Sequence, residues 1–329
     1  DAILASPKCT ELICVPGNGG IADIARCIEI NLDDIEALVK TAVREKPGLV
    51  VIGPEGPLVL GLSDRLREEG FLVFGPSSEA AKIEGSKGFM KDLCYKYNIP
   101  TANSKRFHDA QKAKEYLDFV EMPIVVKADG LAAGKGVTVC KSRQEALIAI
   151  ESLMINKVFG NSGSSILIEE FLEGEEVSFF ALVNGDCSLP LIAAQDHKTA
   201  FDGNEGPNTG GMGAYSPAPI VDAEMIEIIM SKIINPTIRG MVADGIPYQG
   251  ILFAGLMITN NGPKLIEYNC RFGDPECQVL MVRLKSDALE MFLATALGKM
   301  DKLEIDWFKE SVITVILASK GYPGSYKIG

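Results

Sequence analysis

One polar segment carries the densest set of reactive side chains in this chain: Glu267, Asn269, Arg271, Asp274 and Glu276 follow an apolar run. Side chains alternate faces along a strand, so Glu267 and Asn269, two residues apart, point the same way. A carboxylate and an amide oxygen side by side suit Mg²⁺, which keeps its other positions for water and phosphates. A lone Glu-x-Asn is also compatible with a polar strand end at the surface. The neighbouring arginine and acids favour a metal and phosphate site.

A glycine-rich loop at residues 127–137 connects two predicted strands. Small residues let backbone N–H groups approach phosphate oxygens closely. Lys127 lies in an apolar strand, where an unpaired ammonium is costly, so a bound phosphate is a reasonable counter-charge. The loop matches neither the Walker A motif nor the dinucleotide-binding glycine fingerprint. A plain glycine-rich hairpin therefore stays open as the alternative.

Two more segments combine free backbone with charge. Residues 169–177 end one strand and begin another. Their free backbone N–H and C=O groups suit the edge of an adenine ring, and their carboxylates suit ribose hydroxyls. An acidic turn at the surface is the alternative.

Residues 195–213 contain Gln-Asp-His-Lys followed by several glycines. That loop is too rich in glycine to fill a core and too polar for a plain connection, which favours a substrate loop. His197 is given no general-base role.

The elements that must position these segments are of two kinds. Residues 1 to about 75 alternate short apolar strands with helices, which predicts a parallel α/β unit whose ligands meet the carboxyl ends of strands. The loops 17–20 and 53–58 lie at such ends, with ordinary turns as the alternative. A helix beginning at Lys87 is predicted to be capped by Ser86. From about residue 123 the strands form hairpins, one of them with an Asn-Gly turn at 260–262, which predicts antiparallel sheets.

Composition limits the possible partners. A net charge of −12 over 329 residues argues against nucleic acid or an anionic membrane as partner. No apolar run approaches the roughly 20 residues that a membrane span needs. Eight cysteines without a C-x-x-C pair indicate reduced thiols and a cytoplasmic location. The chain opens on Asp1 and stops in a turn-rich passage, so we expect a fragment of a longer polypeptide.

In combination, these segments closely resemble the glycinamide ribonucleotide synthetase family of ATP-grasp enzymes, over about residues 1 to 329. The specific blocks are residues 53–58, 127–137, 195–198, 206–215 and 269–276. The resemblance implies a fold class of α/β and α+β, with an N-terminal parallel domain before an ATP-grasp body of two antiparallel lobes. The expected division is 1–80 for the substrate-side domain, 81–122 for a linker helix and the start of the ATP-grasp body, 123–180 for the small lobe with the glycine-rich phosphate loop, 181–310 for the large lobe with the metal site, and 311–329 for the start of a further domain.

The same resemblance implies roles for individual residues. ATP would contact Lys87, Lys127, Gly134, Lys135, Gly136, Glu169, Phe171, Leu172 and Glu176. Mg²⁺ or Mn²⁺ would bind Glu267 and Asn269. Arg271, Lys127, Asp196 and Lys198 would act in catalysis. The other substrates would meet Asn18, Gly19, Glu55, Asp196, Lys198, Gly210, Gly211, Met212, Asp274 and Glu276.

The implied reaction is the ATP-dependent ligation of glycine to 5-phosphoribosylamine in de novo purine (IMP) biosynthesis. Its products are glycinamide ribonucleotide, ADP and phosphate, formed via glycyl phosphate, and the enzyme is expected to be a monomer or weak homodimer. Two departures from the family stand out: the usual Gly-Gly-Arg-Glu-His loop is absent, and residues 253–256 lack the second metal carboxylate of many ATP-grasp enzymes. A sister carboxylate–amine ligase and a nucleotide-binding protein without catalysis are the competing interpretations.

Overall fold

Short parallel strands joined by helices build the N-terminal part of the chain. The computed structural model describes residues 1–132, 135–203 and 205–327. β1 pairs in parallel with β2, and β3 pairs in parallel with β4, as the alternation of strands and helices predicts. The elements are β1 (Ile13–Cys14), α1 (Gly19–Ala22), β2 (Arg26–Cys27), α2 (Ile35–Glu45), β3 (Val50–Val51), α3 (Glu55–Val59), α4 (Leu62–Glu68), β4 (Val73–Phe74) and α5 (Ser78–Gly85).

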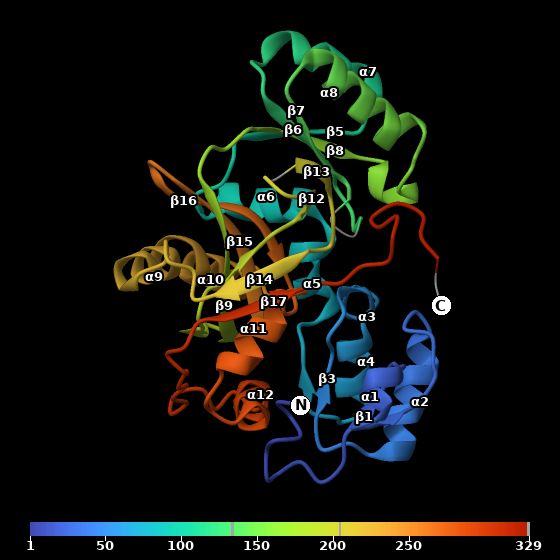
Figure 1. The fold of residues 1–329 in the computed structure, drawn as a ribbon, viewed down its shortest axis with the longest axis vertical. Helices are drawn as coiled ribbons and strands as arrows, with labels where there is room; N and C mark the ends of the chain where they lie inside the picture. Colours follow the sequence, from blue (N-terminus) through green and yellow to red (C-terminus); the bar gives the residue numbers. More distant parts are fainter. Residues whose placement is uncertain (133–134, 204, 328–329) are drawn as a thin grey trace.

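A four-stranded antiparallel sheet in the order β5-β8-β6-β7 forms the small lobe, at the top of Figure 1. Its core is separate from the rest and includes Val126, Ile150 and Ile168. The helix before it begins as predicted, since the Ser86 side chain accepts from the Phe89 N–H at 3.1 Å. The elements are α6 (Lys87–Lys96), β5 (Ser104–Phe107), α7 (Ala110–Tyr116), η1 (Leu117–Phe119), β6 (Ile124–Ala128), β7 (Val137–Cys140), α8 (Arg143–Ile150), η2 (Glu151–Ile155), η3 (Gly160–Gly163) and β8 (Ile166–Glu170).

The large lobe is organised around a second antiparallel sheet, in the order β10-β9-β15-β16. A three-stranded sheet, β11-β14-β17, adjoins it through β11 and β9, and β12 and β13 form a separate two-stranded sheet. The elements are β9 (Glu175–Asn184), β10 (Cys187–Pro190), β11 (Gln195–Asp196), β12 (Thr199–Phe201), β13 (Glu205–Asn208), β14 (Gly213–Ser216), α9 (Ala223–Ile229), η4 (Met230–Ile234), α10 (Asn235–Ala243), β15 (Gln249–Thr259), β16 (Gly262–Asn269), α11 (Glu276–Arg283), α12 (Ala288–Ala296) and β17 (Val312–Val315).

The predicted division into domains stays a prediction, and one strand, β9, runs across an assigned boundary. β5 belongs to the small-lobe sheet and falls inside segment 81–122, which was expected to hold the linker helix and the start of the ATP-grasp body. β9 crosses the expected boundary at residue 180 and pairs only within the large-lobe sheet. Antiparallel pairing throughout both lobe sheets confirms the predicted fold class.

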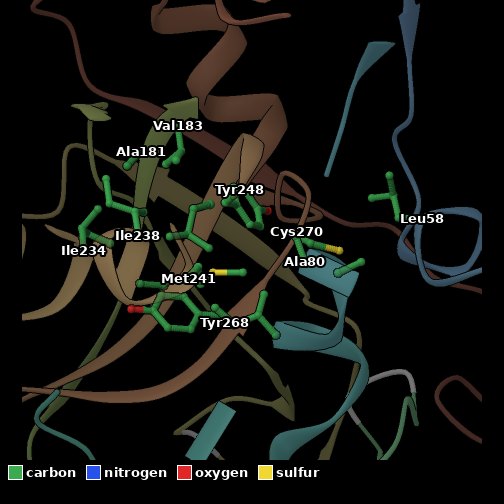
Figure 2. Close-up of a cluster of buried hydrophobic side chains, with 14 of the residues drawn as sticks. Leu58, Ala80, Ala181, Val183, Ile234, Ile238, Met241, Tyr248, Tyr268 and Cys270 are labelled. Atoms are coloured by element: carbon green, nitrogen blue, oxygen red, sulfur yellow. The ribbon is translucent and has the colours of Figure 1, made fainter. Parts of the chain in front are cut away.

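Strand alternation divides the large lobe between two cores. Along β9, Phe179 and Ala181 face the core shared with the N-terminal part, whereas Phe180 and Leu182 face the core under α11 and α12. Figure 2 shows the shared core, where Leu58 of the N-terminal part belongs to the same cluster as residues of α10, β15 and β16. Its two tyrosines keep their hydroxyls satisfied, since Tyr248 donates to the Ile251 carbonyl and Tyr268 pairs with Thr237, both at 2.6 Å. The shared core fixes the N-terminal part against the large lobe.

In the part of the chain that the structure describes, no helix is long and apolar enough to cross a membrane.

Candidate active site

The β15–β16 hairpin sets the positions of the predicted metal ligands. Glu267 lies opposite Gly255, and Asn269 lies opposite Phe253. The register shifts beside Gly255, so that Ile266 is the extra residue of a β-bulge just before Glu267. Bulges of this kind redirect the side chains next to them and are common beside active sites. Glu267 and Asn269 keep their i, i+2 relationship after the bulge, and both line the same cavity, as the sequence predicts.

That cavity has a volume of about 590 Å³ and is lined by the N-terminal part and both lobes. Cavities of this size accommodate nucleotide-sized ligands. Its wall brings together the predicted residues Glu55, Lys87, Lys127, Gly136, Glu176, Asp196, Lys198, Gly210, Glu267, Asn269, Arg271, Asp274 and Glu276.

Glu267 is the negative centre of a group of cations. Burial alone would raise the pKa of Glu267, but Lys198, Lys87 and Lys127 together lower it below its usual value. Among the described residues, the side chains of Glu267 and Asn269 have no hydrogen-bond or ion-pair partner. The Glu267 carboxylate is thus ionised and free to bind a ligand, and the amide oxygen of Asn269 lies beside it. A carboxylate and an amide oxygen are suitable ligands for Mg²⁺ or Mn²⁺. No cluster of three or more His, Cys, Asp or Glu residues suited to a metal occurs within residues 1–132, 135–203 and 205–327.

Arg271 is held by two carboxylates from the N-terminal part. Its Nε lies 3.1 Å from Glu55, and its Nη2 lies 3.3 Å from Glu84. Glu84 also accepts the backbone N–H of Cys270 at 2.7 Å. Burial lowers the pKa of Arg271, but Glu84 and Glu55 more than offset this, so the pKa is raised. Sequence reasoning found Glu55 and missed Glu84, which lies in helix α5 and has no motif to mark it.

A second charged group lies at the β11 side of the cavity. Lys198 lies 3.1 Å from Glu176 and 3.9 Å from Asp196. Buried Glu276, the first residue of α11, accepts from the Ser178 hydroxyl at 2.8 Å. Burial raises the pKa of both carboxyls; Glu176 and Glu267 add to the rise at Asp196, and Asp196 adds to the rise at Glu276. Two closely placed acids with raised pKa values are suited to receive a ligand cation.

Asp129 connects the glycine-rich loop after β6 to helix α6. Its Oδ1 accepts from the Ser86 hydroxyl at 2.9 Å and from the Gly88 N–H at 2.8 Å, and its Oδ2 accepts from Ser165 at 2.7 Å. Burial raises the pKa of Asp129, but these three hydrogen bonds lower it overall. Lys87 is thereby placed at the start of α6, with its side chain on the cavity wall.

Several predicted residues lie away from the cavity wall. Asn18 and Gly19 are exposed, and the Asn18 side chain caps α1 by accepting from the Ile21 N–H. Lys135 is exposed and donates to the Pro323 carbonyl at 3.4 Å. Glu169 is buried behind Lys127.

Four other predicted residues have different surroundings. Phe171 is exposed, Leu172 is half-buried, and Gly211 and Met212 lie just beyond the Gly210 end of the lining. Gly134 lies outside the described residues. The roles of all these residues stay predictions.

Two lobes built on antiparallel sheets, around a cavity lined by the Glu267–Asn269 pair, lysines and an arginine, define an ATP-grasp enzyme. Solved structures agree. The chain aligns with phosphoribosylamine–glycine ligase of Thermotoga maritima at a TM-score of 0.84 and 31% identity, covering 96% of this chain and 76% of that one. Biotin carboxylase of Campylobacter jejuni, in complex with an ATP analogue, aligns at a TM-score of 0.70 and 17% identity, covering 92% of this chain and 69% of that one. The second similarity shows the fold alone.

Family models and relatives of known function identify the family within the ATP-grasp enzymes. The phosphoribosylglycinamide synthetase N domain matches residues 1–84, and the ATP-grasp (A) domain of the same enzyme matches residues 85–277. Phosphoribosylamine–glycine ligase of Brucella melitensis is 54% identical, covering 99% of this chain and 76% of the relative. The chloroplastic enzyme of Arabidopsis thaliana is 53% identical, covering 100% of this chain and 63% of the relative. The chain therefore belongs to the phosphoribosylglycinamide synthetase family, which confirms the family and the ligase class predicted from sequence.

Proposed function

We propose that the chain ligates glycine to 5-phosphoribosylamine, using ATP, to give glycinamide ribonucleotide, ADP and phosphate in de novo purine biosynthesis. The observation that carries this assignment is the uncommitted Glu267–Asn269 pair, which faces a cavity also lined by Lys87, Lys127, Lys198 and Arg271. Such a site suits the transfer of a phosphoryl group held by cations.

The chemistry follows from the poor electrophilicity of a carboxylate. A glycine carboxylate oxygen attacks the γ-phosphorus of ATP, the bond to the β-phosphate oxygen breaks, and ADP leaves. The product is glycyl phosphate. The amine of 5-phosphoribosylamine then attacks the acyl carbon, loses a proton and expels inorganic phosphate. The protein's contribution is mainly to position the reactants and to neutralise charge.

Three cationic side chains on the cavity wall would bind the phosphates of the nucleotide. Lys87 and Lys127 would bind phosphate oxygens, and Arg271, held by Glu55 and Glu84, would face the transferred phosphoryl group. Mg²⁺ or Mn²⁺ on Glu267 and Asn269 would neutralise charge on the β- and γ-phosphate oxygens.

The acids near β11 would serve the amino-acid substrate. Glycine carries an ammonium group, and Asp196 and Glu276 are neighbouring carboxyls on the cavity wall. A bound ammonium would favour their ionised forms and offset the mutual repulsion of the two charges. Lys198, paired with Glu176, would lie between this acidic pair and the metal site.

We propose that the reaction takes place in the cytoplasm. All eight cysteines are free thiols, as expected for the reducing cytoplasm. We keep the expectation of a monomer or weak homodimer without nucleic-acid or membrane partners.

Isotope transfer tests the chemistry directly. Glycine labelled with ¹⁸O in its carboxylate is incubated with the intact protein, MgATP and 5-phosphoribosylamine. The proposed route transfers one ¹⁸O into inorganic phosphate per turnover, which mass spectrometry detects. Product formation with unlabelled phosphate would show that glycine is activated in another way.

A further inference from the structure

A charged group lies behind the cavity, on the side away from solvent. It consists of Lys91 on α6, Glu169 at the end of β8 and Lys127 on β6. Their exposed fractions are 1%, 3% and 4%. Both ammonium groups approach the same carboxylate oxygen, Oε2 of Glu169, at 3.3 Å from Lys91 and 3.0 Å from Lys127. Burying three charges is costly, so the arrangement must offset that cost through its contacts or serve a ligand.

Lys91 is fully committed within the protein. Its ammonium has three protons, and it has three acceptors: Thr101 Oγ1 at 2.8 Å, the Ala102 carbonyl at 2.9 Å and Glu169. Thr101 donates in turn to the Leu265 carbonyl at 2.7 Å, immediately before the bulge on β16. Lys91 therefore has no donor left for the cavity.

Lys127 has a different position. Besides Glu169, its ammonium has one acceptor among the described residues, the carbonyl of bulge residue Ile266 at 3.3 Å. The side chain also lines the cavity, so its third donor is free to meet a ligand. The other oxygen of Glu169, Oε1, is buried and has no hydrogen-bond partner within the described residues. The group thus carries one excess positive charge, with the free donor on the cavity side.

We propose that Lys91 is a positioning residue for the nucleotide phosphates. Lys91 neutralises Glu169 on the side away from the cavity, so that the positive charge of Lys127 remains available to a ligand in the cavity. Without Lys91, the single carboxylate would neutralise Lys127 and hold it away from a ligand. Helix geometry fits this arrangement, because Lys91 lies one turn after Lys87 on α6, with Lys87 on the cavity wall and Lys91 against Glu169. This inference rests on the proposed function, since it assumes that the cavity binds polyphosphate.

Charge restoration tests this role. The probe is inorganic tripolyphosphate with Mg²⁺, which has no base and so does not depend on any contact of Glu169 with adenine. Lys91→Met should weaken tripolyphosphate binding about tenfold, as expected for loss of one nearby charge. The double variant Lys91→Met with Glu169→Gln restores the net charge and should bind at least about threefold tighter than Lys91→Met alone. KM for glycine should change less than about twofold in Lys91→Met.

The controls separate this role from a structural one. Lys96→Met removes an exposed lysine of the same helix, paired with Asp244, and should leave tripolyphosphate binding unchanged. Glu169→Gln alone should tighten tripolyphosphate binding, and this arm remains informative if Lys91→Met fails to fold. A double variant that binds no better than Lys91→Met, or a Glu169→Gln variant that binds more weakly than wild type, would overturn the inference. Failure of the wild-type protein to bind MgADP would instead contradict the proposed function.

Discussion

The guanidinium of Arg271 lies 3.3 Å from the carboxylate of Glu84, which connects the segment just after β16 to helix α5 of the N-terminal part. The same carboxylate accepts the N–H of Cys270. One acidic side chain thus fixes both the backbone and the side chain at the end of β16. We infer that the N-terminal part contributes to catalysis by positioning Arg271, in addition to any contact with substrate.

Replacing this acid tests the connection. Glu84→Gln should destabilise the protein by about 1–3 kcal/mol, because a buried arginine loses one of its two charged partners. Turnover should fall more than the KM values rise, since Arg271 would face the transferred group only in the reacting complex. Urea unfolding and steady-state kinetics measure the two effects. Glu79→Gln, an exposed acid of the same helix, is the matched control; an equal loss there would rule out a specific role for Glu84.

The metal assignment predicts a selective loss. Glu267→Gln keeps the shape of the side chain but removes the ionised ligand, so Mn²⁺ binding, followed by electron paramagnetic resonance, should be lost together with about 100-fold or more in turnover. Glu173→Gln, an exposed acid outside the cavity, should leave both unchanged. Mn²⁺ affinity retained within about twofold in Glu267→Gln would place the metal elsewhere.

The turn beside Pro275 should not tolerate a side chain. Gly211 has φ +126°, and a Cβ there would lie 2.4 Å from Pro275 Cδ. Gly211→Ala should therefore cost about 1–3 kcal/mol and displace the loop that precedes Glu276. Gly48→Ala is the control, because nothing lies within 4 Å of its Cβ position. Thermal unfolding compares the two; equal melting temperatures would show that the 209–213 turn adapts without strain.

Glycine binding should depend on pH through the acidic pair. Burial raises the pKa of Asp196 and Glu276. As pH falls, these groups gain protons before ordinary carboxyls do, and a neutral carboxyl attracts an ammonium only weakly. KM for glycine should therefore rise as pH falls from about 8 to about 5, while KM for ATP changes less. The trend should be weaker in Glu276→Gln. A pH-independent KM for glycine would remove the pair from the glycine site.

Sequence alone predicted the parts of the site that lie within one local pattern. Alternation along β16 placed Glu267 and Asn269 on one face, and the glycine-rich hairpin placed Lys127 at the cavity. The residues it missed depend on contacts between distant segments. Glu84 and Lys91 lie in helices whose sequence shows only amphipathic spacing. Their partners, Cys270 and Arg271 for Glu84 and Glu169 for Lys91, come much later in the chain.

The bulge at Ile266 could not be predicted from the sequence either. A bulge is a property of two paired strands, and β16 carries no glycine or proline at that position to mark it. Its consequence is local but specific, since the Ile266 carbonyl accepts from Lys127. The sequence analysis likewise predicted no strand at Ser104–Phe107, because this segment pairs with β8, which lies far along the chain.

The most direct test of the whole account is ADP release by the intact protein with MgATP and glycine, with and without freshly made 5-phosphoribosylamine. The account predicts steady ADP formation only when glycine and the amine are both present. ADP formation with other carboxylates in place of glycine would assign the chain to a sister ligase. Measurable ATP binding without turnover under any of these conditions would contradict the proposed activity.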